Sequence, residues 1–239
     1  MGEMSEWKAR RFWKQAEAEA VEGGWRVTLD GKPVMTPGKL PLILPTEALA
    51  RAIAAEWEAQ QDVIDPLSMP LTRAANSAIE KVTPQFDAVA EMLAAYGGTD
   101  LLSYRATEPD RLHERQCAAW DPILDWVEAR HGARLATTRG LMPVAQDAEA
   151  LARLRAPLDG LDAFRLTALH DLVTLSGSLV LGLAVLDGRL TAAEAHALSR
   201  VDDEFQAEGW GRDDEAETAA ANRLAAMENA ERLLKLLAS

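Results

Sequence analysis

Apolar and polar residues alternate strictly near the start of the chain. Alanine alternates with glutamate between residues 16 and 20, and Trp25, Val27 and Leu29 alternate with polar residues. A period of two is typical of a half-buried β-strand, although alanine and glutamate alone favour helix. Gly23-Gly24 separates the two runs and predicts the turn of a β-hairpin.

The period changes after four closely spaced prolines. Prolines at positions 33, 37, 41 and 45 divide the chain into short extended pieces that we expect only at sheet edges or strand ends. From Thr46 onward the apolar residues follow a helical period, with Leu49, Ile53 and Trp57 on one face. Thr46 is therefore predicted to cap a helix.

The rest of the chain is predicted to be helical. The segment 62–70 contains prolines at 66 and 70 and is interpreted as a linker, so we expect a β-rich N-terminal domain with one helix at 1–67 and a helical domain at 68–239. The predicted helices run from Thr83 to Gly97, from Asp121 to His131, from Asp147 through Leu154, from about Asp162 to Leu186, from Thr191 onward, and from about Asp213 to Leu237. The predicted fold class is α+β, with a small β-rich N-terminal domain followed by a larger all-helical C-terminal domain.

The net charge narrows the choice of partners. The 239 residues include 25 Lys and Arg against 38 Asp and Glu, giving a net charge of -13 and a pI near 4.8. Such a chain is repelled by nucleic acids and anionic lipids, although solubility alone also accounts for the acidity. The apolar stretch 179–186 is shorter than the roughly 20 residues of a membrane span, so we expect neither nucleic-acid binding nor membrane insertion.

Catalytic and cofactor motifs are missing from the sequence. Cys117 is the only cysteine, which rules out an intrachain disulfide, and no histidine stands in a metal-binding motif. His170-Asp171 lies near Ser176 and Ser178, but a Gly-x-Ser-x-Gly elbow is absent and helical serines usually bond to their own backbone. Gly177 and Gly182 are interpreted as close-packing positions in an apolar helix. We therefore expect no enzyme activity, no cofactor and no metal.

An acidic segment near the C-terminus contains two large aromatic residues. Acids recur between residues 202 and 217, and Phe205 and Trp210 lie among them. A solvated helix end, a core-anchored turn and a partner-binding surface all fit this pattern. A carboxylate-dependent hydrolase that uses the acids of 202–217 is the enzymatic alternative, and a plain scaffold module is a third.

Short motifs spread along the chain occur in the order typical of one known family. They are Arg11-Phe12-Trp13-Lys14, Leu29 to Val34, Thr36-Pro37, Leu44 to Ala50, Ala55 to Gln60, Ile64-Asp65-Pro66, Met69 to Arg73, Thr99 to Leu102, Tyr104-Arg105-Ala106, Trp120-Asp121-Pro122, Gly177 to Leu181, and Ser199-Arg200 through Trp210-Gly211. Together they resemble the assembly chaperone family that serves the alpha subunit of the F-type ATP synthase catalytic head, known from mitochondria and some bacteria.

The resemblance implies a partner and a binding segment. The partner would be the free alpha subunit, protected until it assembles with the beta subunit. The implied partner-binding residues are Asp202, Asp203, Glu204, Phe205, Gln206, Trp210, Asp214 and Glu215. The acidic start of the chain does not read as a mitochondrial presequence, so we expect a bacterial cytoplasmic protein. Without a sustained heptad pattern, we expect a monomer when free.

Overall fold

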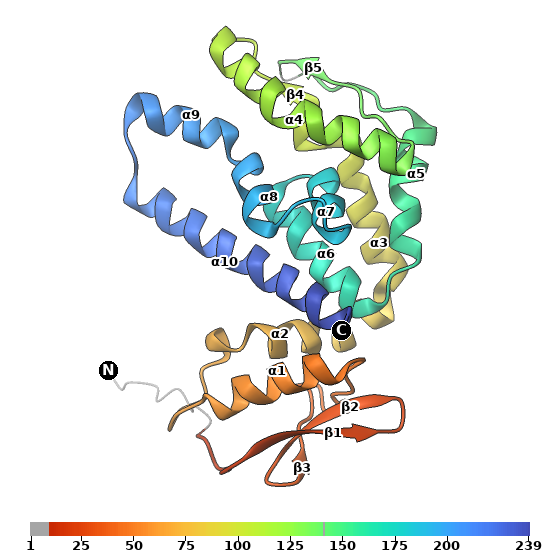
Figure 1. The fold of residues 1–239 in the computed structure, drawn as a ribbon, viewed down its shortest axis with the longest axis vertical. Helices are drawn as coiled ribbons and strands as arrows, with labels where there is room; N and C mark the ends of the chain where they lie inside the picture. Colours follow the sequence, from red (N-terminus) through yellow and green to blue (C-terminus); the bar gives the residue numbers. More distant parts are fainter. Residues whose placement is uncertain (1–9, 141) are drawn as a thin grey trace, which may run out of the picture. The chain divides into compact units, whose positions relative to one another are not determined.

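The computed structural model describes residues 10–140 and 142–239 (Figure 1). Its contacts separate two compact units, one formed by residues 1–84 with 235–239 and the other by residues 85–234. The residues behind the expectation of a missing presequence lie within 1–9, outside the described part. The boundary predicted after residue 67 concerns which piece folds alone, so it stays a prediction.

The first unit contains an antiparallel sheet in the order β1-β2-β3. Strands β1 (Ala16–Val21) and β2 (Gly24–Leu29) confirm the predicted hairpin, and β3 is short (Lys32–Pro33). Val21 pairs with Gly24, so the turn is Glu22-Gly23 rather than the predicted Gly23-Gly24. The shift has a backbone reason, because Gly23 has a φ of 86°, which favours glycine.

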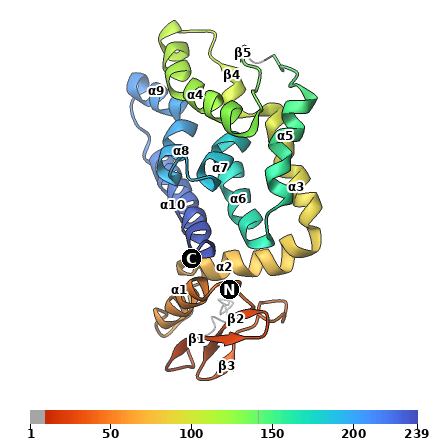
Figure 2. The same cartoon turned by 45° about the vertical axis from the view of Figure 1, so that its right-hand side comes forward.

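Helix α1 (Glu47–Glu58) packs on the hairpin (Figure 2). The Thr46 hydroxyl accepts a hydrogen bond from Leu49 N, which confirms the predicted cap. The predicted linker is partly helical, because α2 (Pro70–Ser77) begins at its last residue. The buried Glu56 carboxylate accepts hydrogen bonds from the backbone N–H groups of Leu71 and Thr72, and this long-range cap starts α2.

The second unit begins with α3 (Phe86–Ala95). The predicted cap at Thr83 is wrong, because its hydroxyl donates to Ala78 O and a short 3-10 turn precedes α3. The predicted start of the next helix at Asp121 is also wrong. Helix α4 (Asp110–His131) begins eleven residues earlier and holds Pro122 in its interior. This unit also contains a parallel pair, β4 (Tyr104–Arg105) with β5 (Thr138–Arg139), so it is mostly but not wholly helical.

Four helices form the centre of this unit. They are α5 (Ala148–Asp159), α6 (Ala163–Ser176), α7 (Leu179–Leu186) and α8 (Ala192–Ser199). The side chain of Asp147 caps α5, and Thr191 with Glu194 forms the predicted capping box of α8. The single helix predicted from 162 to 186 is wrong, because Gly177 ends α6 with a φ of 72° and Ser178 caps α7.

Two further helices, α9 (Val201–Trp210) and α10 (Asp214–Leu237), complete the chain. Helix α9 replaces the predicted turn at the acidic segment, while α10 confirms the predicted last helix. Among the described residues, every helix is too short or too polar to cross a membrane.

Candidate functional site

The acidic segment folds as two helices joined by a short connection. Helix α9 ends at Gly211, whose φ is 95°, and the Asp213 carboxylate accepts a hydrogen bond from Ala216 N at 2.8 Å to cap α10. Negative side chains in the first turn of each helix are favourable because the helix N-terminus carries partial positive charge. The acids therefore lie where local helix physics favours them.

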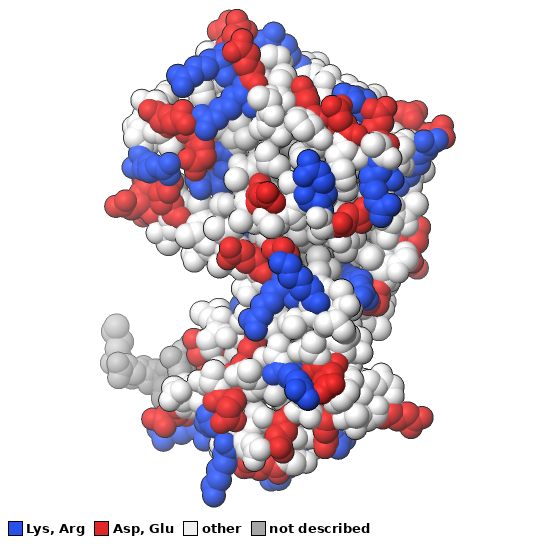
Figure 3. All heavy atoms as spheres, in the orientation of Figure 1, with Lys and Arg blue, Asp and Glu red and all other residues white. Residues whose placement is uncertain are grey.

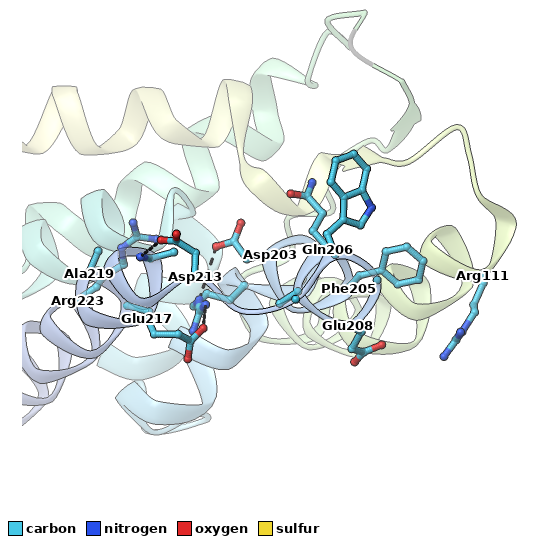
Figure 4. A pocket seen from close by; sticks show the side chains of 16 residues that line it. Arg111, Asp203, Phe205, Gln206, Glu208, Asp213, Glu217, Ala219 and Arg223 are labelled. Carbon is cyan, nitrogen blue, oxygen red and sulfur yellow. Dashed lines mark hydrogen bonds and ion pairs between the residues drawn. The ribbon is translucent and has the colours of Figure 1, made fainter.

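A groove lies along these two helices and has a volume of about 670 Å³ (Figure 4). Its wall also contains Arg111 from α4. The lining residues are Arg111, Arg200, Asp203, Phe205, Gln206, Ala207, Glu208, Gly209, Trp210, Gly211, Asp213, Ala216, Glu217, Ala219, Ala220 and Arg223. We call this the α9–α10 groove, and it lies entirely within the second unit.

The two aromatic residues of α9 differ in environment. Phe205 is half-buried, and its ring centroid lies 6.0 Å from the guanidinium carbon of Arg111, on the side to which it points in Figure 4. Trp210, at the end of the helix, leaves 94% of its surface exposed. A tryptophan in water exposes a large apolar area, which is typical of a surface that binds a partner.

Arginines neutralise most acids around the groove. Arg200 and Arg212 both contact Glu204, at 3.1 and 2.9 Å, and both also contact Glu217. On α9, Glu208 bonds to Arg115 of α4 at 2.7 Å. Figure 3 shows acidic and basic side chains mixed over this part of the surface. The segment is therefore a network of ion pairs rather than a uniformly negative patch.

These ion pairs also set the charge states. The hydrogen bond from Arg115 holds the pKa of the Glu208 carboxyl below its usual value. The Glu204 carboxylate beside Arg212 raises the pKa of that guanidinium. Burial, followed by the positive charges of Arg200 and Arg223, lowers the pKa of nearby His196. The acids remain ionised and the imidazole remains neutral near neutral pH.

Asp202 has a separate, inward-facing role. Its carboxylate is half-buried and accepts a hydrogen bond from Gln116 Nε2 of α4 at 2.7 Å. Gln116 is buried, and its side-chain oxygen accepts a bond from Ala106 N. Asp202 therefore fastens the start of α9 to α4.

The eight predicted residues divide into two groups. Asp203, Phe205, Gln206 and Trp210 line the groove, whereas Asp202, Glu204, Asp214 and Glu215 lie beside it. Within the described chain, we find no ion pair for Asp214 or Glu215, and both are exposed. No group of three His, Cys, Asp or Glu side chains among the described residues is placed to hold a metal ion.

Sequence reasoning missed the arginines of the groove. Arg200 precedes Glu204 by four residues, a spacing that predicts a helical ion pair once α9 is recognised as a helix. Arg111 and Arg115 lie about ninety residues earlier and give no local signal. Only the packing of α4 against α9 brings them to the site.

Comparison with known proteins places the chain among assembly chaperones. The family model described as ATP12 chaperone protein matches residues 10–128. The curated mitochondrial protein atp12 of Schizosaccharomyces pombe is 26% identical over 216 residues, which cover 84% of this chain and 74% of that protein. The groove residues from 200 onward lie outside the range matched by the family model.

Two solved structures of Atp12 from Paracoccus denitrificans are similar over almost the whole chain. The D202K mutant of Atp12p is 63% identical, covers 98% of this chain and 100% of that chain, and has a TM-score of 0.95. The other structure, also 63% identical, covers 97% of this chain and 100% of that chain, with a TM-score of 0.94.

Proposed function

The chain belongs to the ATP12 chaperone family, which acts in ATP synthase assembly, and we propose that its client is the free alpha subunit of the catalytic head. The choice of alpha is supported by the ordered sequence motifs from Arg11 to Gly211 that resemble the chaperones serving that subunit. In this proposal the chain protects alpha until beta takes its place.

We propose that the exposed end of α9 and the start of α10 contact the client. The observation that carries this choice is Trp210, whose indole is 94% exposed beside the groove. Asp214 and Glu215, two or more positions beyond the end of α9, are exposed and supply negative charge that attracts a basic client surface.

The paired acids have a different task in this proposal. Glu204 and Glu217 are held by Arg200 and Arg212, so they fix the geometry of the two helices rather than offer free charge. The Asp202 bond to Gln116 acts in the same way. Client affinity then depends on Trp210, Phe205 and the unpaired acids.

We propose that this segment performs no catalysis. The alternative, a carboxylate-dependent hydrolase, needs a general acid with a raised pKa. The pKa of Glu208 is shifted downward by Arg115, which is opposite to that requirement. Ion pairing of Glu204 and Glu217 with arginines likewise favours a structural role for these acids.

We further propose a bacterial cytoplasmic setting and a monomeric free state. The setting is supported by the 63% identity to Atp12 of Paracoccus denitrificans. Sedimentation of the purified chain measures the monomer directly, and a stable dimer contradicts it.

The test is capture of the alpha subunit by single variants of the chain. Trp210→Ala and Glu215→Lys are each expected to weaken alpha binding at least about tenfold, because truncation of an interface tryptophan commonly costs 2 kcal/mol or more. Co-expression followed by affinity capture ranks the variants, and titration of the purified proteins gives the dissociation constants.

Matched controls separate the site from general effects. Met142→Ala removes a comparably exposed apolar side chain, at 76%, elsewhere in the same unit. Glu228→Lys makes the same charge change on the same helix as Glu215→Lys, away from the groove. Equal losses in tests and controls contradict the site, whereas capture of beta in preference to alpha contradicts the client.

A further inference from the structure

Strand β1 is an edge of the three-stranded sheet and pairs only with β2. The Val21–Gly24 pair closes a two-residue turn, so its backbone groups bond across the hairpin, and every second pair along the strands repeats this arrangement. The phase is fixed independently. Asp30 N donates to Gln15 O, whereas Trp25 exchanges both backbone bonds with Leu44 on its other side.

It follows that Ala16, Ala18 and Ala20 direct their backbone N–H and C=O groups away from β2. One of these groups already has a partner, because Ala16 N donates to Glu58 Oε2 of α1 at 2.9 Å. Within the described residues, we find no hydrogen bond for the outward groups of Ala18 and Ala20. Their spacing along the edge matches that of another extended backbone.

A second groove lies between this edge and α1. It has a volume of about 700 Å³ and is lined by alanines 16, 18, 54, 55 and 59, with Glu17 and with Arg51 and Glu58 at its rim. Figure 1 shows α1 lying across the hairpin. The small side chains leave space for apolar side chains of an added strand on the face that Ala16 and Ala18 share.

The opposite face of β1 carries negative charge. Glu17 and Glu19 point there, and Glu22 follows in the turn. A second copy of this chain would place glutamates beside glutamates, which is destabilising between neighbouring strands. Lysine or arginine at alternate positions would instead pair with Glu17 and Glu19.

We infer that the outer edge of β1 binds an extended segment of a partner protein, with alternating cationic and apolar side chains, as an additional strand. The cationic side chains lie over Glu17 and Glu19, and the apolar ones enter the groove against Ala54 and Ala55. This inference goes beyond the proposed function, since it concerns another surface and holds whichever subunit is the client.

The test uses a defined peptide, acetyl-(Lys-Val)₃-amide, and the full isotope-labelled chain. At millimolar peptide we expect the amide protons of Ala18 and Ala20 to exchange with solvent about tenfold more slowly, because they become hydrogen-bonded. The matched peptide with glutamate in place of lysine is expected to leave them unchanged. NMR resolves both amides individually.

Two variants locate the binding. Ala18→Pro removes an outward N–H while keeping the ladder to β2, since proline is tolerated at such edge positions. Ala55→Leu fills the groove from α1 without touching β1, and Ala221→Leu, an exposed alanine on α10, is its control. We expect the first two to abolish the protection of Ala20 and the control to retain it.

Several results overturn the inference. They are no binding of the cationic peptide at millimolar concentration, equal binding of the acidic peptide, and binding that leaves Ala18 and Ala20 exchanging as before. If Ala18→Pro does not fold, Ala55→Leu against Ala221→Leu decides. Because no ATP synthase subunit is used, the outcome is independent of whether alpha is the client.

Discussion

Asp100 is a fully buried carboxyl group at the junction of three segments. It accepts hydrogen bonds from Ser178 Oγ at 2.7 Å and from the backbone N–H groups of Leu102 and Val180, both at 3.1 Å. Burial raises its pKa to about 6, and the three donors limit this rise by favouring the charged form. It therefore ties the ends of two helices together at an electrostatic cost.

This cost makes stability depend on pH. Between the usual value of 3.8 and about 6, the folded chain holds the Asp100 proton more tightly than the unfolded chain does. The stabilisation from this group is present at low pH and is lost as pH rises through about 6, by roughly 3 kcal/mol at most. Urea unfolding of the wild type and of Asp100→Asn between pH 4 and 7 measures it.

The variant isolates the contribution of Asp100. Glu80 and Glu194 have lowered pKa values and give the opposite pH slope, but they do so equally in both proteins. We expect the free energy of unfolding of the wild type, minus that of Asp100→Asn, to fall as pH rises. A difference that stays constant from pH 4 to 7 contradicts the raised pKa.

At the scale of elements, the break between α6 and α7 decides how the second unit packs. A Cβ atom on Gly182 would lie 2.5 Å from Val173 Cγ2 and 3.1 Å from Leu169 Cδ1. The two helices therefore approach closely, which confirms the packing role predicted for Gly182. The same role predicted for Gly177 is wrong, since it ends α6 in a left-handed conformation with open space around it.

Two glycine substitutions test this packing. Gly182→Ala is expected to destabilise the chain by about 1 to 3 kcal/mol, because Val173 must move. Gly209→Ala, in helix α9 with no neighbour within 4 Å of the added atom, is expected to stabilise it by about 0.5 to 1 kcal/mol. Thermal unfolding compares the two, and equal effects contradict the close contact.

At the scale of the whole molecule, the chain end returns to the unit in which the chain begins. Residues 235–239 group with the first unit, where Leu236 O accepts a hydrogen bond from Thr46 Oγ1 at 2.7 Å. Leu237 is 4% exposed. The end of α10 therefore contributes to the cap region of α1.

Removal of residues 235–239 is expected to destabilise the first unit by about 2 to 4 kcal/mol, since one buried leucine and one hydrogen bond are lost. Hydrogen exchange of the amides in Glu47–Glu58 measures the effect. Removal of Ser239 alone, which is exposed, is the control. Unchanged exchange after the longer truncation contradicts a structural role for the chain end.

The sequence by itself determined the features whose causes are local. The hairpin of residues 16–29, the cap at Thr46, the capping box at Thr191 and the α+β order follow from patterns within a few residues. The acidic and aromatic character of 202–217 was also visible. Such signals can be read because the interacting groups are neighbours in the chain.

Only the tertiary structure decided the features with distant causes. Glu56 starts α2 through Leu71, Asp100 joins the break at Ser178, and Arg115 reaches Glu208 across α4 and α9. Tertiary packing also left Trp210 in solvent and buried half of Phe205. A buried polar group must find a partner wherever the fold provides one, and no local pattern announces that partner.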